Sequence, residues 1–63
     1  MIDAIDLKPG DVVVVDGNYV VCILSNEKHY GIGELRTIKY LVADKIVTIT
    51  CSAFTEFKCV ITT

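Results

Sequence analysis

The 63-residue chain contains no tryptophan and one proline, and its only aromatic residues are three tyrosines and two phenylalanines. Charge is also sparse, since 22% of the residues are charged and the formal net charge is −2. A protein that gains its affinity by neutralising many phosphates is usually basic, so this composition disfavours that class of function. The longest unbroken apolar run, 19–24, is far shorter than the roughly 20 residues that span a bilayer. We therefore expect no membrane segment.

Basic residues are also scarce near the start of the sequence. Asp3 and Asp6 occupy the region where a secretory signal carries positive charge, so we expect a cytoplasmic protein. There are three cysteines, and none forms a C-x2-4-C pair. Cys22, His29, Cys51 and Cys59 together offer the donor types of a zinc site, but not its usual spacing. We expect reduced, buried thiols and no metal or cofactor, with zinc binding and a Cys51–Cys59 disulfide as the less favoured alternatives.

Catalytic groups are equally scarce. His29 is the only histidine, and nothing in its sequence context pairs it with one of the cysteines as a base with a nucleophile. We expect a protein that is not an enzyme and has no small-molecule substrate. Aliphatic side chains, by contrast, are abundant, because 52% of the residues are hydrophobic and the mean hydropathy is +0.54. A domain this small cannot enclose them all, so the excess should form an exposed patch that contacts a protein partner or a second copy.

The central stretch predicts a β-hairpin that is entered through a bend. Pro9-Gly10 has the residues of a tight turn, and Asp16-Gly17 separates the two β-branched runs 12–15 and 19–25. Both runs are apolar at odd and even positions, whereas a half-solvated strand would alternate. Each face of these strands should therefore be covered, either by the rest of the domain or by another chain.

The remainder predicts three further strands. The first, 34–42, has Leu35 and Leu41 on one parity and its other apolar residues on the opposite one, so we expect a bulge or bend near Thr37. A tight turn at 43–44 leads to a strand over 45–51, with Thr48 and Thr50 outside. We expect a 3₁₀ turn at 52–56, a last strand over 57–62, and an N-terminal flap formed by 1–7. These elements predict an all-β fold, a single domain over 1–63 that is a five-stranded SH3-like barrel with one 3₁₀ turn before the last strand.

One family resemblance covers about two-thirds of the chain. The run from Gly10 to Val21, then Lys28, Gly31 and Gly33, and then the run from Arg36 to Leu41, resembles the N-terminal SH3-like domain of elongation factor P and its hypusine-bearing relatives. The resemblance implies an SH3-like fold, which KOW-type modules share. In that family a loop presents a Pro-Gly-Lys-Gly tip with a modified lysine. The corresponding stretch here, 29–33, has neither the proline nor the lysine, so the modification chemistry is not implied.

Two functions remain open. The favoured one is a non-catalytic protein that docks on a larger assembly or on itself, with large side chains as anchors: Tyr19, Tyr30, Ile32, Tyr40 and Phe54. Its size and composition are typical of bacteriophage accessory and inhibitor proteins. The alternative is a module that binds RNA, the ribosome or single-stranded nucleic acid through a basic and aromatic face: Lys28, His29, Tyr30, Arg36, Lys39 and Tyr40.

Overall fold

The computed structural model describes residues 1–29, 31 and 33–61, and over these residues the chain is all-β apart from one 3₁₀ turn. The strands are β1 (Ile2–Asp3), β2 (Val12–Val15), β3 (Tyr19–His29), β4 (Leu35–Val42), β5 (Lys45–Ser52) and β6 (Glu56–Ile61). They form one antiparallel sheet in the order β1-β6-β2-β3-β4-β5. The all-β prediction is confirmed, but the sheet has six strands rather than five. No helix in the described part of the chain is long and apolar enough to cross a membrane.

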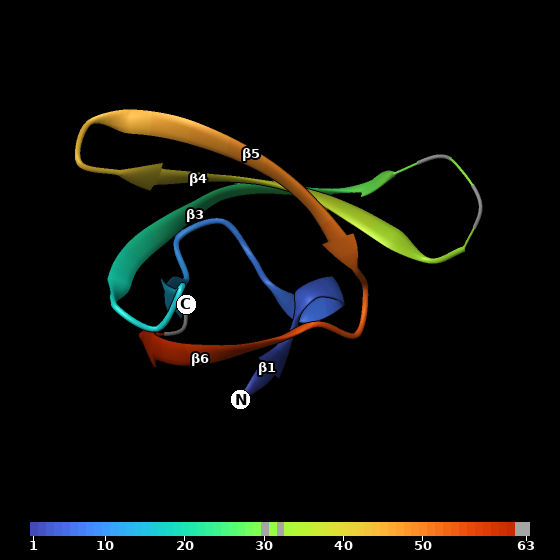
Figure 1. Cartoon of the computed structure of the whole chain (residues 1–63), viewed down its shortest axis with the longest axis horizontal. Helices are drawn as coiled ribbons and strands as arrows, with labels where there is room; N and C mark the ends of the chain where they lie inside the picture. Colours follow the sequence, from blue (N-terminus) through green and yellow to red (C-terminus); the bar gives the residue numbers. More distant parts are fainter. Residues whose placement is uncertain (30, 32, 62–63) are drawn as a thin grey trace.

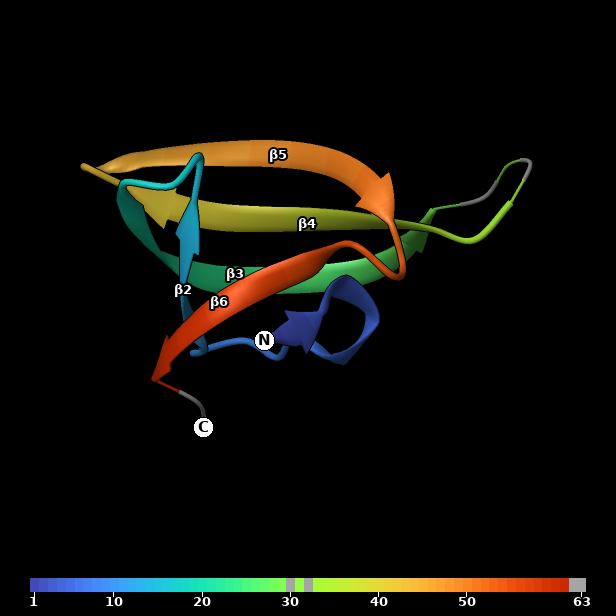
Figure 2. The same cartoon turned by 60° about the horizontal axis from the view of Figure 1, so that its bottom comes forward.

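The sheet curls around a small core. Figure 1 shows β5 and β6 on opposite sides of the interior, and Figure 2 shows β3, β4 and β5 side by side with β6 crossing in front of them. Val13, Val21, Ile23 and Ile38 are each at most 1% exposed and form the centre of the core. These side chains come from β2, β3 and β4, so most of the centre of the core lies on the hairpin that the sequence predicted.

The predicted turns are present, and their backbone geometry explains their residues. Gly10 has a φ of 95° and follows proline, as in a type II turn, and the Asp11 N–H donates to the Lys8 carbonyl at 3.0 Å. Between β2 and β3, Asp16 and Gly17 have φ values of 51° and 75°, in the left-handed region. Aspartate and glycine tolerate that region better than most residues, so this turn joins the two strands with a small steric penalty.

Two register shifts interrupt the sheet, one where β2 pairs with β6 and one in β3 where it pairs with β4, and neither lies near Thr37. The register of β4 against β5 is continuous from Leu35 to Val42, whereas the pairing of β3 with β4 shifts between Ile23 and Ser25. The bend expected near Thr37 is therefore wrong, and Leu35 and Leu41 simply face away from the core. The bulge at Leu24 has a consequence further along β3, because it turns Asn26 to the inner side, opposite the buried Ile38.

The N-terminal segment is more ordered than a flap. β1 pairs with β6 through Ile2 and Phe57, and the 3₁₀ turn over Ala4–Asp6 follows it directly. Ala4 is fully buried, and its N–H donates to the Thr55 carbonyl at 2.8 Å. The 3₁₀ turn was expected between the last two strands and is instead here. Between β5 and β6 there is room for only one turn, since β6 begins at Glu56. In that turn the Thr55 N–H donates to the Ser52 carbonyl at 3.1 Å.

Candidate functional site

A row of apolar side chains crosses the outer face of the sheet. The strand register places Val12 opposite Cys22, Cys22 opposite Leu41, and Leu41 opposite Ile46. Directly opposed residues share a face, so these four side chains, which we call the outer row, run from β2 to β5. Leu41 is 39% exposed and Ile46 is 65% exposed, while Val12 and Cys22 are half-buried. The row is thus an apolar stripe that reaches the solvent at its β5 end.

Two further side chains on β3 widen this stripe. Val20 and Leu24 precede and follow Cys22 by two residues, and they are 58% and 39% exposed. We call the outer row together with these two residues the outer apolar face. It exists because β2 and the first half of β3, 19–24, carry apolar residues at every position, while the core accepts only one side of each strand. A contiguous apolar patch of this kind on a small domain is typical of a surface that contacts another protein.

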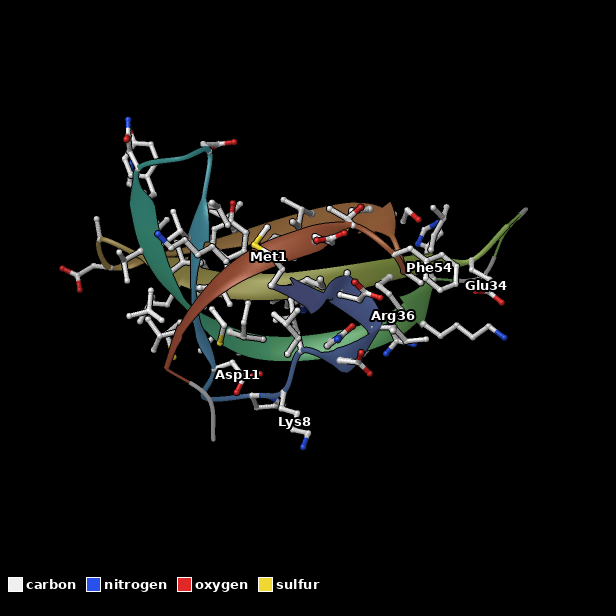
Figure 3. The ribbon with its side chains drawn as sticks, turned by 90° about the horizontal axis from the view of Figure 1, so that it is seen from below. Met1, Lys8, Asp11, Glu34, Arg36 and Phe54 are labelled. Carbon is white, nitrogen blue, oxygen red and sulfur yellow. The ribbon has the colours of Figure 1, made fainter. Side chains whose placement is uncertain are left out.

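A groove lies on the other side of the sheet, where β5 and β6 approach each other without pairing. Its volume is about 550 Å³, and its walls include Ile49 and Cys51 of β5 and Phe57 and Lys58 of β6. Met1, which is 81% exposed, lies at the same groove, and Figure 3 shows it beside β6. Because the sheet does not close here, the inward side chains of β5 are only half-buried.

The structure separates the residues expected to anchor a protein partner. Tyr19, at the start of β3, is 58% exposed, and Phe54, in the turn after β5, is 62% exposed. They lie toward opposite ends of β4, since Tyr19 and Val42 line one small pocket and the Ala53 N–H donates to the Glu34 carbonyl. Tyr40 is 8% exposed and belongs to the core, so its expected position on the surface is wrong. Tyr30 and Ile32 lie outside the described residues.

The basic residues of the nucleic-acid hypothesis do not share one face either. Lys28 and Arg36 are opposed on β3 and β4, whereas Lys39 lies on the outer side of β4. The Arg36 guanidinium is engaged locally, because its Nε donates to Asn26 Oδ1 at 2.9 Å and its Nη2 to the Asn26 carbonyl at 3.2 Å. His29 Nδ1 shares a hydrogen bond of 3.1 Å with Thr37 Oγ1. The buried Tyr40 offers no stacking surface, and Tyr30 is again outside the described residues.

Lys28 and Arg36 instead line a pocket of about 180 Å³ with Glu34, Ile5 and Ala53. Figure 3 shows Arg36, Glu34 and Phe54 gathered at this end of the molecule. The carboxylate of Glu34 offsets part of the positive charge, so the pocket is not a strongly basic one.

The three cysteines lie in two environments. Cys22 belongs to the outer row, whereas Cys51 and Cys59 pack against the core, and all three are free thiols. Burial raises the pKa of the Cys51 thiol, and a hydrogen bond with the Thr55 side chain lowers it by less. Among the described residues, no group of three or more histidine, cysteine, aspartate or glutamate side chains could hold a metal ion.

No family model matches this chain, and neither a curated protein nor a solved structure matches it. The functional argument therefore depends on the surfaces themselves.

The sequence alone did not predict the outer apolar face, because aromatic residues were preferred as anchors over Leu41 and Ile46. The available signal was parity, since Ile46 shares the outward side of β5 with Thr48 and Thr50, and Leu41 opposes it across the hairpin.

Proposed function

We propose that this protein is a non-catalytic docking module whose outer apolar face binds the surface of another protein. The observation that supports this proposal is the continuous stripe from Val12 to Ile46, which ends in side chains that are 39% and 65% exposed. Burial of apolar surface is the main source of affinity in protein association, at about 25 cal/mol per Å² before the costs of ordering. A larger assembly and a second copy are both suitable partners. The association with bacteriophage proteins depends on size and composition alone and stays a prediction.

We prefer this function to nucleic-acid binding for a geometric reason. A single-strand-binding surface combines a basic groove with aromatic rings that stack on bases. Among the described residues of that hypothesis, Lys28 and Lys39 lie on different sides of the sheet, and Tyr40 is in the core. The net charge of −2 gives no compensating long-range attraction.

For the fold we propose an SH3-like barrel with β1 added at one end. The support is the strand order β6-β2-β3-β4-β5, in which successive hairpins are followed by a last strand that returns beside the first. The resemblance to the N-terminal domain of elongation factor P is consistent with this order and remains part of the proposal. An experimental structure in which β6 does not return beside β2 would contradict it.

The docking function is tested with the double variant V20K/L41K. Both residues are exposed and lie on the outer apolar face, so lysine should leave the core intact and make burial of this face unfavourable. We expect the wild-type chain, immobilised and exposed to a cell lysate, to retain a discrete protein that the variant retains at least tenfold less. The control is E34Q, which changes the charge in the same direction at a residue outside the face and should retain that protein fully. Equal retention by V20K/L41K and wild type would contradict the proposal.

A further inference from the structure

The two end strands of the sheet differ in what they leave open. β1 has two residues, whereas β5 has eight. In the described sheet, β5 pairs with β4 along one edge. An end strand presents backbone N–H and carbonyl groups along its outer edge, and these groups form a template for another strand. Among the described residues, the outer edge of β5 is therefore a long, unshared hydrogen-bonding surface.

β5 also lacks the features that usually protect such an edge. Natural proteins place charges, prolines or bulges on edge strands. Here the one charged residue is Lys45 at the first position, no proline occurs, and the register with β4 has no bulge. The residues from Val47 to Ser52 alternate between apolar and hydroxyl side chains, and valine, isoleucine and threonine, which make up most of β5, favour sheet pairing.

We propose that β5 pairs in an antiparallel manner with β5 of a second copy, across a two-fold axis at Ile49. In this register Thr48 of one copy lies opposite Thr50 of the other, on the outer side, and Val47 lies opposite Cys51 on the inner side. The pairing satisfies the edge groups of both copies at once and turns two open sheets into one continuous sheet.

The absence of charge along most of β5 favours a second copy of this chain as the partner strand. The segment from Ile46 to Ser52 is uncharged, so two copies meet along it without opposing like charges. The two Lys45 ammonium groups fall at opposite ends of the paired strands. At about 3.3 Å per residue this separation exceeds about 25 Å, which is beyond the screening length of about 8 Å at physiological salt. A strongly acidic or basic partner strand would have no complementary charge here.

The groove gives the pairing a second contribution. Ile49 and Cys51 are half-buried because the groove of about 550 Å³ leaves their side of β5 open. In a two-fold pair the inner sides of both β5 strands face the same way. Ile49 then meets its symmetry mate, and each copy covers apolar surface that the other leaves in contact with water. One strand pair buries less area than a standard interface, so we expect a dissociation constant on the order of tens of micromolar.

This inference uses the edge of β5 and does not rest on docking by the outer apolar face. The test is sedimentation equilibrium from about 1 to about 500 µM, where the wild-type chain should pass from monomer to dimer. T48K/T50K places lysine opposite lysine twice, and we expect at least tenfold weaker dimerisation. T48K/T50E keeps the lysine at 48 and reverses the sign at 50, which places opposite charges together twice. It should dimerise as tightly as wild type or more tightly.

Thr48 and Thr50 are exposed, so both variants should remain folded, which amide exchange of the core residue Ile38 verifies. Equal dimerisation of T48K/T50K and wild type would overturn the proposal, and so would a failure of T48K/T50E to restore the dimer. Dimerisation that is lost in V20K/L41K but kept in T48K/T50K would assign self-association to the outer apolar face and overturn the edge pairing. As a second measurement, amide exchange within β5 should slow as protein concentration rises in the wild type.

Discussion

Lys8 and Asp11 are joined by two hydrogen bonds that run in opposite directions. The Asp11 N–H donates to the Lys8 carbonyl at 3.0 Å, and the Lys8 N–H donates to Asp11 Oδ2 at 2.8 Å. Asp11 is 1% exposed, and its own carbonyl accepts from the Ile23 N–H at 2.8 Å. Figure 3 shows Asp11 on the inner side of this bend and the Lys8 side chain directed to solvent. The carboxylate thus holds the turn closed at the point where β2 begins.

Replacing Asp11 with alanine should lower the free energy of unfolding by about 1–3 kcal/mol, because the Lys8 N–H loses its acceptor in a site with little access to water. Asp11→Asn keeps one side-chain oxygen and should cost less. Urea unfolding of both variants measures the difference. Equal stability of D11A and wild type would show that water replaces the carboxylate without loss.

Asn26 joins the N-terminal segment to the sheet. Its Nδ2 donates to the Ala4 carbonyl at 2.7 Å and to the Leu7 carbonyl at 2.9 Å, while its Oδ1 accepts from Arg36. Asn26→Ala removes all three bonds and should destabilise the protein by about 2–3 kcal/mol. The Ala4 and Ile5 amides should exchange faster than those of β3 and β4, because the 3₁₀ turn is released first.

Ser25→Ala is the control for Asn26→Ala, since Ser25 precedes Asn26 but faces the outer side. It should leave the exchange of Ala4 and Ile5 unchanged. Uniform acceleration of all amides in the asparagine variant would mean that Asn26 supports the whole sheet and not the N-terminal segment in particular.

The turn between β4 and β5 contains backbone strain. Ala43 and Asp44 have φ values of 46° and 66°, and alanine is disfavoured in this left-handed region. Changing the pair to Asn-Gly, which suits a type I′ turn, should stabilise the protein by about 1 kcal/mol. For a domain of this size that gain corresponds to a rise in Tm of about 4–8 °C. Ala43→Val should lower Tm, because a β-branched residue fits the left-handed region less well. A lower Tm in the Asn-Gly variant would contradict the claim that this turn is strained.

The Cys51 thiol should deprotonate at a higher pH than an ordinary cysteine. Its pKa is raised above the ordinary value of 9.0, first by desolvation and with a smaller opposing effect of the Thr55 hydrogen bond. Less thiolate is present at any given pH, so iodoacetamide should alkylate Cys51 more slowly than free cysteine at pH 8–9. Peptide mass spectrometry at several pH values follows this rate. Alkylation of Cys51 at the rate of free cysteine would contradict burial of the thiol.

The same shift has a consequence for stability. The folded state keeps the thiol proton to a higher pH than the unfolded chain does, so the contribution of Cys51 to stability is fully present below about pH 9 and declines as pH rises through the folded-state value. Cys51→Ala should remove this decline. The free energy of unfolding of the two proteins at pH 8 and pH 10 provides the comparison.

Local sequence determined the elements of this protein. Pro9-Gly10 and Asp16-Gly17 specify their turns because few other residues accept the required φ values, and β-branched runs specify the strands beside them. The alternation in 45–51 correctly placed Thr48 and Thr50 outside. The excess of apolar residues also correctly predicted that large aliphatic side chains would remain exposed.

Only the tertiary structure decided which side of each strand is exposed and where the sheet stays open. The bulge at Leu24 depends on how β3 fits against β4, and a one-residue shift in pairing reverses every later side chain. Tyr40 could not be assigned to the core from parity alone, because β4 carries apolar residues on both sides. The outer row forms from four different strands, so no local pattern contains it. It follows from the register, which long-range packing sets.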